Sequence, residues 1–459
     1  MAVKQAILIV VALALGVLPA KALPAPAQEA PPPGAISDNV EFIANIPELR
    51  TAVSLNFLGD TMFVSAFTGL HSYDVSDPAN PKRLGSLPMY LHQNEDVDID
   101  PVRKRAYLSR DPRGAPGVPS GTFPYGAVHI VDISNPALMT LIGTFTLPAG
   151  HTSTCINDCD FLWTGGPVAN ALVQPGWTGR PIYATDVTDP LNPKPCPQPV
   201  DLGRNDGVTD YAHDVQVDGM GIAWVSSTGG IRGYWTQGEH RDPLTGEVRT
   251  ATACDPVPYA GGGTPNEATP SRFMHNSLRP LDTQIPGDDA SRGMILYGTE
   301  ENVVSNCATS GRFATYDLRG SFDGEGWRDI DQTRFRLTAL DSWWPEKQEG
   351  STGCASAHYF DDRGDGLLAY SFYGQGTRFL DVSDPRDIRQ VGYYRPNDAS
   401  SWAAYWRDEY VFVTDNSRGV DILRFTDAPA ETDLVAPPLT VALPQLRMDP
   451  AFGYLCALR

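Results

Sequence analysis

One short sequence motif recurs along the chain and restricts the folds that the chain can adopt. A short, apolar-rich strand ends in an acidic residue and runs into a Ser-Asp-Pro turn, first in residues 69–81. Proline has no N–H to donate to a strand ladder, so the strand has to end before Pro78. The short Ser and Asp side chains can bond to the nearby backbone and hold the turn. Further copies carry their acidic residue at Asp132, Asp186 and Asp381, and a weaker copy at Asp317.

The spacing of these copies predicts a repeat architecture. The acidic residues at positions 74, 132, 186, 317 and 381 are separated by steps of 58, 54, 131 and 64 residues. The step of 131 spans about two units, with a degenerate copy near residues 231–235. Repeats of this length built from short strands are typical of a β-propeller.

The recurring strand resembles the LVIVD repeat, named for a strand that ends in Val-Asp and precedes a Ser-Asp-Pro turn. The resemblance covers about residues 39–426 and implies a β-propeller. The turn has a complete structural explanation, so the repeat implies a fold and leaves the chemistry open.

The inner strands predict an all-β, seven-bladed propeller closed by its N-terminal strand. These strands are expected to begin near Ala52, His92, His151, His213, His275, His358 and Trp402. The unit near residues 403–425 contains three strands, and residues 40–46 look like an outer strand without a unit of its own. Pairing the two would close the ring and remove two exposed sheet edges.

The segments that flank the repeats predict an exported protein. Residues 1–22 read as a signal peptide, with Lys4, a short apolar core and a small-residue cleavage pattern; the alternative is an uncleaved anchor. Residues 23–38 are expected to form a Pro/Ala-rich tether, residues 39–426 the propeller, and residues 427–459 a tail packed on it. We therefore expect a secreted or extracytoplasmic protein, monomeric, with no membrane span in the mature chain.

Charge and cysteine content narrow the function classes further. A formal charge of -20 argues against nucleic acid and anionic membranes as partners. All seven cysteines follow the signal peptide, which suits an oxidising compartment. Because seven is an odd number, at least one cysteine has no disulfide partner within the chain. We expect Cys155–Cys159 and Cys307–Cys354 disulfides, although Cys155 and Cys159 could alternatively join a metal site after His151.

Five of the eight histidines are expected to open an inner strand, at steps of 59, 62, 62 and 83 residues. The first strand of each propeller blade lines the central channel, so residues that start equivalent strands should converge at one channel mouth. Imidazole is a common ligand for transition metals, and Glu300 is the best carboxylate candidate. The predicted metal site contains His92, His151, His213, His275, His358 and Glu300.

Other interpretations of these histidines stay open. A propeller channel is polar, and its histidines could instead be hydrogen-bonded to Asp and water. His71 and His129 lie on third strands and His240 in an insertion, which argues against a role for them as ligands. The first and seventh blades lack a histidine at this position, so an open coordination position is expected on their side.

A second resemblance bears on the metal. Residues 150–155 and 272–276 are similar to the His-Thr-x-x-Cys and Arg-Phe-x-His segments of the selenium-binding, methanethiol oxidase propellers, which are associated with copper. Carotenoid-cleaving oxygenases offer another comparison, because they hold iron with four histidines on a propeller axis. These resemblances imply copper or iron; the Gly-x-Ser-x-Gly, phosphate-loop and His-Glu-x-x-His templates are absent from the sequence.

Two functions follow from the sequence. The first is a metalloprotein with a copper or iron ion at the channel mouth, which could act as an oxidase or oxygenase on a small molecule. The second is a non-catalytic propeller that binds a protein or glycan through its insertions at residues 111–126, 237–271 and 319–352. The substrate or ligand is not readable from the residues.

Overall fold

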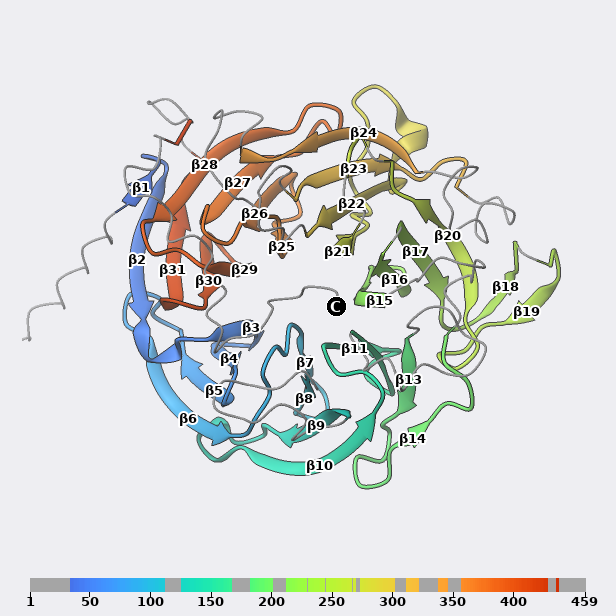
Figure 1. Ribbon diagram of the computed structural model, residues 1–459, viewed down its shortest axis with the longest axis horizontal. Helices are drawn as coiled ribbons and strands as arrows, with labels where there is room; N and C mark the ends of the chain where they lie inside the picture. Colours follow the sequence, from blue (N-terminus) through green and yellow to red (C-terminus); the bar gives the residue numbers. More distant parts are fainter. Residues whose placement is uncertain are drawn as a thin grey trace, which may run out of the picture.

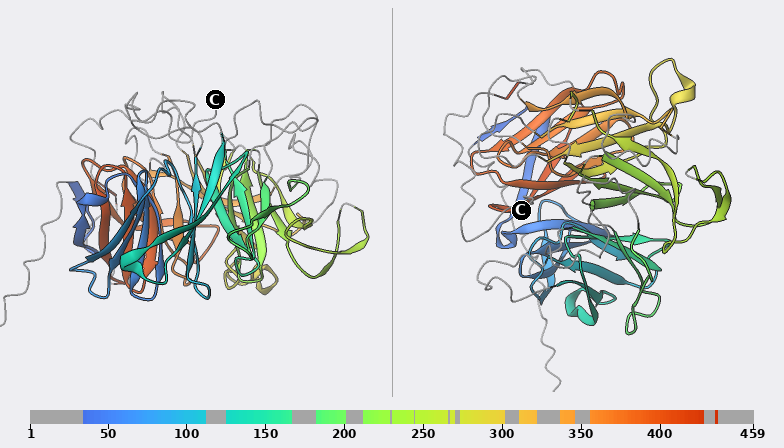
Figure 2. Two further views of the ribbon diagram at one scale, coloured as in Figure 1. Left: turned by 90° about the horizontal axis from the view of Figure 1, so that it is seen from below. Right: turned by 45° about the vertical axis from the view of Figure 1, so that its right-hand side comes forward.

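The chain forms a closed ring of seven β-sheets in the computed structural model (Figure 1). The structure describes residues 34–111, 125–166, 182–200, 212–228, 230–243, 245–265, 267–269, 273–301, 311–321, 337–345, 356–427 and 435–436. Sequence order follows the ring, as the colours of Figure 1 make visible, and the blades stand side by side around the axis (Figure 2). The predicted seven-bladed propeller is confirmed.

Each blade has an inner strand beside the axis and three strands further out. The inner strands are β3 (Ala52–Leu58), β7 (Val97–Asp100), β11 (Thr152–Ile156), β15 (Ala212–Val217), β21 (Met274–Leu278), β25 (Phe360–Asp362) and β29 (Ser401–Arg407). The second strands are β4 (Thr61–Ala66), β8 (Arg105–Arg110), β12 (Phe161–Gly165), β16 (Ile222–Ser227), β22 (Ile295–Glu300), β26 (Leu367–Ser371) and β30 (Tyr410–Asp415).

The third strands carry the repeated sequence motif, and the fourth strands form the outer rim of the ring. The third strands are β5 (Gly69–Asp74), β9 (Gly126–Asp132), β13 (Tyr183–Asp186), β17 (Gly230–Trp235), β23 (Phe313–Asp317), β27 (Thr377–Asp381) and β31 (Gly419–Phe425). The fourth are β6 (Lys82–Pro88), β10 (Thr140–Leu147), β14 (Lys194–Pro195), β20 (Val257–Gly263), β24 (Thr338–Trp343), β28 (Arg389–Pro396) and β2 (Val40–Ile46). A hairpin of β18 (Glu239–Arg241) and β19 (Val248–Thr250) lies in an insertion, and 3-10 turns span Pro47–Leu49, Pro136–Leu138 and Asp289–Ser291.

The N-terminal strand closes the ring as predicted. β2 pairs antiparallel with β31, from Val40 opposite Phe425 to Ile46 opposite Val420. The short strand β1 (Gly34–Ile36) adds a fifth strand to the sixth blade by pairing with β28. The end of the segment expected to be a tether is therefore part of a sheet.

The repeated acidic residue holds the turn between the third and fourth strands. Oδ1 of Asp74 accepts the Ser76 N–H at 3.0 Å, and Asp132 accepts that of Ser134 at 2.8 Å. Asp186, Asp317 and Asp381 make the same bond to the residue two positions on. These bonds account for the repeated motif structurally, because Asp side chains stabilise turns in this way.

The core lies between neighbouring sheets. Every residue of β16 and β22 is buried, as expected for second strands packed on both faces. Tyr297 of β22 and Tyr370 of β26 belong to the same apolar cluster, which joins the fifth and sixth blades. This packing fixes the inner strands around the axis.

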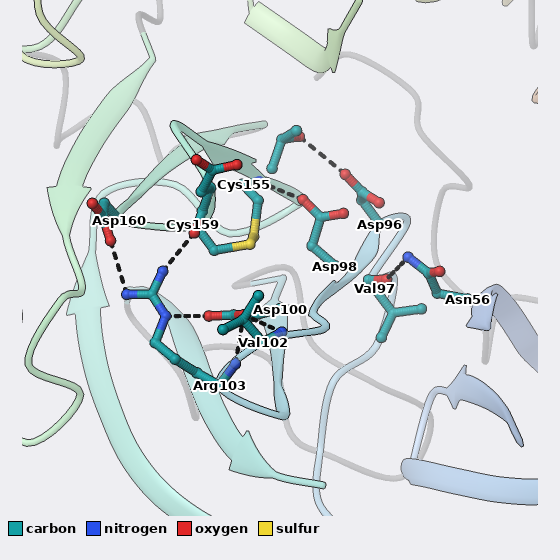
Figure 3. The surroundings of a disulfide bond; sticks show 12 residues. Asn56, Asp96, Val97, Asp98, Asp100, Val102, Arg103, Cys155, Cys159 and Asp160 are labelled. Atoms are coloured by element: carbon teal, nitrogen blue, oxygen red, sulfur yellow. Dashed lines mark hydrogen bonds and ion pairs between the residues drawn. A yellow bond between two sulfur atoms is a disulfide. The ribbon is translucent and has the colours of Figure 1, made fainter. Parts of the chain in front are cut away.

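Two disulfides occur in the described residues. The predicted Cys155–Cys159 bond is confirmed, and it lies beside Asp98 and Arg103 (Figure 3). A Cys196–Cys254 bond, which was not predicted, ties the outer part of the third blade to the insertion of the fourth. Cys307, Cys354 and Cys456 lie outside the described residues, so the predicted Cys307–Cys354 bond stays a prediction. Disulfides persist in oxidising compartments.

The expected signal peptide at 1–22 and most of the expected C-terminal tail at 427–459 lie outside the described residues. Within the described part of the chain, no helix has the length and apolar character needed to span a membrane.

Candidate metal centre

Bulges at the start of the inner strands aim side chains at the ring axis. The pairing register shifts between Ala212 and Asp214, and again between Met274 and Ser277, so that His213 and His275 sit in the irregular part of the ladder. A bulge turns a side chain away from the regular alternation of a strand. The seventh blade has the same shift at Trp402.

Four imidazoles meet at one carboxylate, that of Glu95, just before β7. Its Oε2 lies 3.1 Å from Nε2 of His151, 3.6 Å from Nε2 of His213 and 3.3 Å from Nε2 of His275. Its Oε1 lies 3.5 Å from Nε2 of His358. All five side chains are almost completely buried. We call this group of His151, His213, His275, His358 and Glu95 the His–Glu cluster.

Three of these imidazoles are oriented by a hydrogen bond at Nδ1, the ring nitrogen that does not face Glu95. His213 donates Nδ1–H to the carbonyl oxygen of His275 at 3.0 Å, and His358 donates to that of Trp402 at 2.6 Å. His151 Nδ1 lies 2.8 Å from Oδ2 of Asp111. A carbonyl oxygen can only accept, so Nδ1 of His213 and of His358 carries a proton, and Nε2 of each ring faces the cluster. Outer hydrogen bonds of this kind orient histidines that bind metals.

A second carboxylate, Glu301, adjoins the same cluster. Two groups of side chains could hold a metal ion: Glu95 with His213 and His275, and Glu301 with His275 and His358. Within each group the potential ligand atoms lie within 4.8 Å of one another. Glu301 also accepts a hydrogen bond from the Tyr373 hydroxyl.

Burial and mutual proximity set the charges of the cluster. Burial, together with His275 and His151, lowers the pKa of His213 well below its usual value. Burial and the adjacent His358 lower the pKa of His275 to about 3. Burial alone would raise the pKa of Glu95, but His151 and His358 hold that pKa well below its usual range. Near neutral pH, His213 and His275 are therefore neutral imidazoles beside an ionised carboxylate, the protonation states that bind metals.

The structure brings four of the five predicted histidines together and places His92 differently. His92 lies five residues before β7, with a φ of 57° and its ring 5.1 Å from that of Phe67. In the described part of the chain it is not in either potential ligand group, so a role as a ligand stays a prediction.

The predicted carboxylate also differs by one residue from the one in the ligand groups. Glu300 ends β22 and lies close to Tyr316 and Tyr370, whose pKa values it helps to raise after the larger effect of burial. The described ligand groups contain its neighbour Glu301. A role for Glu300 as a ligand stays a prediction.

Glu95, three residues after His92, is among the acidic residues that the sequence offers as ligands or outer partners, but the predicted site contains Glu300 instead. The repeat carried a stronger signal for Glu95. Residues 95–100, Glu-Asp-Val-Asp-Ile-Asp, align with residues 213–218, His-Asp-Val-Gln-Val-Asp. The final aspartates play the same part: Asp100 accepts the Val102 N–H, and Asp218 that of Met220. Glu95 is therefore the repeat equivalent of His213.

Aromatic residues line the side of the first and seventh blades, which supply no histidine to the His–Glu cluster. Phe67, Tyr373 and Trp402 belong to one buried apolar cluster, which joins the first, sixth and seventh blades. The Trp402 ring lies 4.6 Å from that of His358. We expected an open coordination position on this side, and apolar side chains lie there instead. We call Phe67, Tyr373 and Trp402 the apolar wall.

The remaining histidines make local contacts. Nδ1 of His71 lies 3.1 Å from the Ser86 hydroxyl, and Nδ1 of His129 lies 2.9 Å from that of Thr144, each within its own blade. The His240 ring stacks on Trp235.

The fold and the cluster define a class: a seven-bladed β-propeller with a buried His–Glu cluster on its axis. The chain carries an LVIVD repeat, matched by the model of that family at residues 120–146. No curated protein matches the sequence.

Solved structures share the fold at low sequence identity. A periplasmic gluconolactonase of Pseudomonas aeruginosa is 15% identical with a TM-score of 0.51, covering 84% of this chain and 99% of its own. A candidate 6-phosphogluconolactonase of Bacteroides uniformis is 9% identical with a TM-score of 0.52, covering 86% of this chain and 94% of its own. Likeness at this level concerns the propeller fold alone.

Proposed function

We propose that the protein is an exported metalloprotein that holds a copper or iron ion in the His–Glu cluster and acts as an oxidoreductase. The observation that carries the proposal is the arrangement around Glu95. Four Nε2 atoms lie 3.1–3.6 Å from its carboxylate, and three of the four rings are anchored through Nδ1.

The donor set supports a transition metal of this kind. Imidazole nitrogens suit zinc, copper, iron and nickel, whereas calcium and magnesium prefer oxygen ligands throughout. Copper or iron, when bound, would supply one-electron chemistry that zinc cannot. The two disulfides favour export, because such bonds persist outside the reducing cytosol.

The residues around the cluster have separate roles in this proposal. His151, His213, His275 and His358 would bind the ion, and Glu95 would neutralise charge as a ligand or as an acceptor. Asp111 and the carbonyl oxygens of His275 and Trp402 would orient the imidazoles. The apolar wall around Trp402 would limit the entry of water.

Metal content tests the proposal directly. The mature protein, reconstituted with Cu²⁺ or Fe²⁺ and freed of loosely bound metal, should retain at least one equivalent by mass spectrometry. His213→Ala should lower the affinity by at least about tenfold, because it removes a ligand. His71→Ala, outside the cluster, is the matched control and should retain the wild-type content.

A protein that retains less than about a tenth of an equivalent after reconstitution contradicts the metal function. The histidines would then form only a polar, hydrogen-bonded cluster at the centre of the ring. The alternative function, a non-catalytic propeller that binds a protein or glycan through its insertions, would take precedence.

A further inference from the structure

The His–Glu cluster contains more ligands than one ion requires. The two potential ligand groups contain three imidazoles and two carboxylates, and a fourth imidazole, that of His151, lies 3.1 Å from Glu95. A four-coordinate site needs four donors, and a catalytic site commonly takes three from the protein. We propose, on the basis of the proposed metal function, that the cluster holds two metal ions side by side, with Glu301 a ligand of the second.

His275 is the residue that joins the two positions. It belongs to both potential ligand groups, one with Glu95 and His213, the other with Glu301 and His358. Its Nε2 lies 3.3 Å from Glu95, and its Nδ1 has no hydrogen-bond partner among the described residues. The other three imidazoles have Nδ1 engaged by a carbonyl or carboxylate. His275 therefore lies between the two positions and can supply one ring nitrogen to either of them.

Glu95 is placed to bridge the same two positions. Oε2 faces His151, His213 and His275, whereas Oε1 faces His358. A carboxylate that turns its two oxygens toward different ligand sets can bind one ion through each. Two-metal sites hold their ions about 3.5–4 Å apart, which one carboxylate spans.

The charges of the surrounding carboxylates favour a second ion. Glu95, Glu301 and Asp111 each contact or adjoin the buried cluster. Carboxylates gathered in a buried site repel one another when they are ionised, and cations placed between them offset this cost.

The test counts ions and spins in the mature protein. Saturation with Cu²⁺ should give two equivalents per chain by mass spectrometry. Bridged Cu²⁺ ions couple magnetically, so the integrated electron paramagnetic resonance intensity should fall clearly below the copper content. Glu301→Gln should bind one equivalent and recover a full signal for it. Glu48→Gln, a change of the same kind at a residue that lies outside the cluster and contacts Tyr73, should keep two equivalents.

The outcomes separate this inference from the proposed function. A wild-type protein that saturates at one equivalent overturns the second ion and leaves the metal function intact. A protein that binds none overturns both. Two uncoupled equivalents, or two equivalents retained by Glu301→Gln, overturn the shared site, and the wild-type measurements decide the question even if a variant fails to fold.

Discussion

Single carboxylates in the interior differ in charge because their surroundings differ. Glu95 is surrounded by imidazoles, which keep its pKa low despite complete burial. Asp415, at the end of β30, has no such neighbours: burial, then the nearby Asp421, raises its pKa to about 7. Its Oδ2 accepts the Ser400 N–H at 2.7 Å, and Oδ1 accepts that of Ser417 at 2.8 Å. Asp415 therefore retains its proton in the folded protein at mildly acidic pH.

Asp415 should make stability fall as pH rises. Its folded pKa lies above that of an unfolded aspartate, about 3.9, so its contribution is complete below pH 4 and declines up to about pH 7. Because a tenfold difference in proton affinity between the folded and unfolded states corresponds to about 1.4 kcal/mol, the loss over this window amounts to a few kcal/mol. Asp415→Asn should flatten this part of the curve of unfolding free energy against pH, measured with urea. An unchanged slope would contradict the assigned protonation.

At the scale of the element, bulges and close backbone contacts shape each blade. The bulges that contain His213, His275 and Trp402 place these residues beside the axis. Ring closure depends on a similar local feature, since Gly419 begins β31 with a φ of 99°. A Cβ at Gly419 would lie 2.2 Å from the carbonyl oxygen of Ile46 in the closing strand.

Gly419→Ala should therefore weaken ring closure. The variant combines an unfavourable positive φ with a backbone clash, and should lose at least about 2 kcal/mol more unfolding free energy than its control. Gly59→Ala is that control, because Gly59 has a φ of 59° and open space around its Cβ. The control should lose only about 1–2 kcal/mol. Equal losses in urea unfolding would show that closure tolerates a side chain here.

At the scale of the whole molecule, the ring is stabilised by closure and by covalent links of very different span. Cys155–Cys159 joins residues 4 apart within the third blade, whereas Cys196–Cys254 joins residues 58 apart across two blades. A longer loop loses more conformational entropy in the unfolded chain when it is closed.

Removing the longer link should cost more stability. Loop-closure entropy predicts a loss of about 4 kcal/mol for the Cys196→Ser/Cys254→Ser double variant and about 2 kcal/mol for Cys155→Ser/Cys159→Ser. Thermal unfolding of both variants without reductant measures the difference. A larger loss from the short link would indicate that it acts mainly on the folded state, next to the bonds of Arg103 and Asp98 (Figure 3).

The sequence by itself determined the architecture, because the fold repeats local chemistry. The strand that ends at Asp74 and its copies show where each third strand stops, and the count of expected inner strands gives seven blades. The unpaired strand at residues 40–46 indicated closure, since a ring leaves no exposed edge. Histidines in equivalent positions, such as His151 and His213, indicated one end of the axis.

Only the tertiary structure decided which side chains meet at the axis. The direction of each side chain depends on bulges in its strand and on packing between blades. The tertiary structure placed Glu95 among four imidazoles and His92 against Phe67. It also separated the neighbours Glu300 and Glu301, which a one-residue step along the chain directs to different surroundings. A repeat fixes where a residue sits along its strand, whereas the distances between atoms on different blades are set by the closed ring.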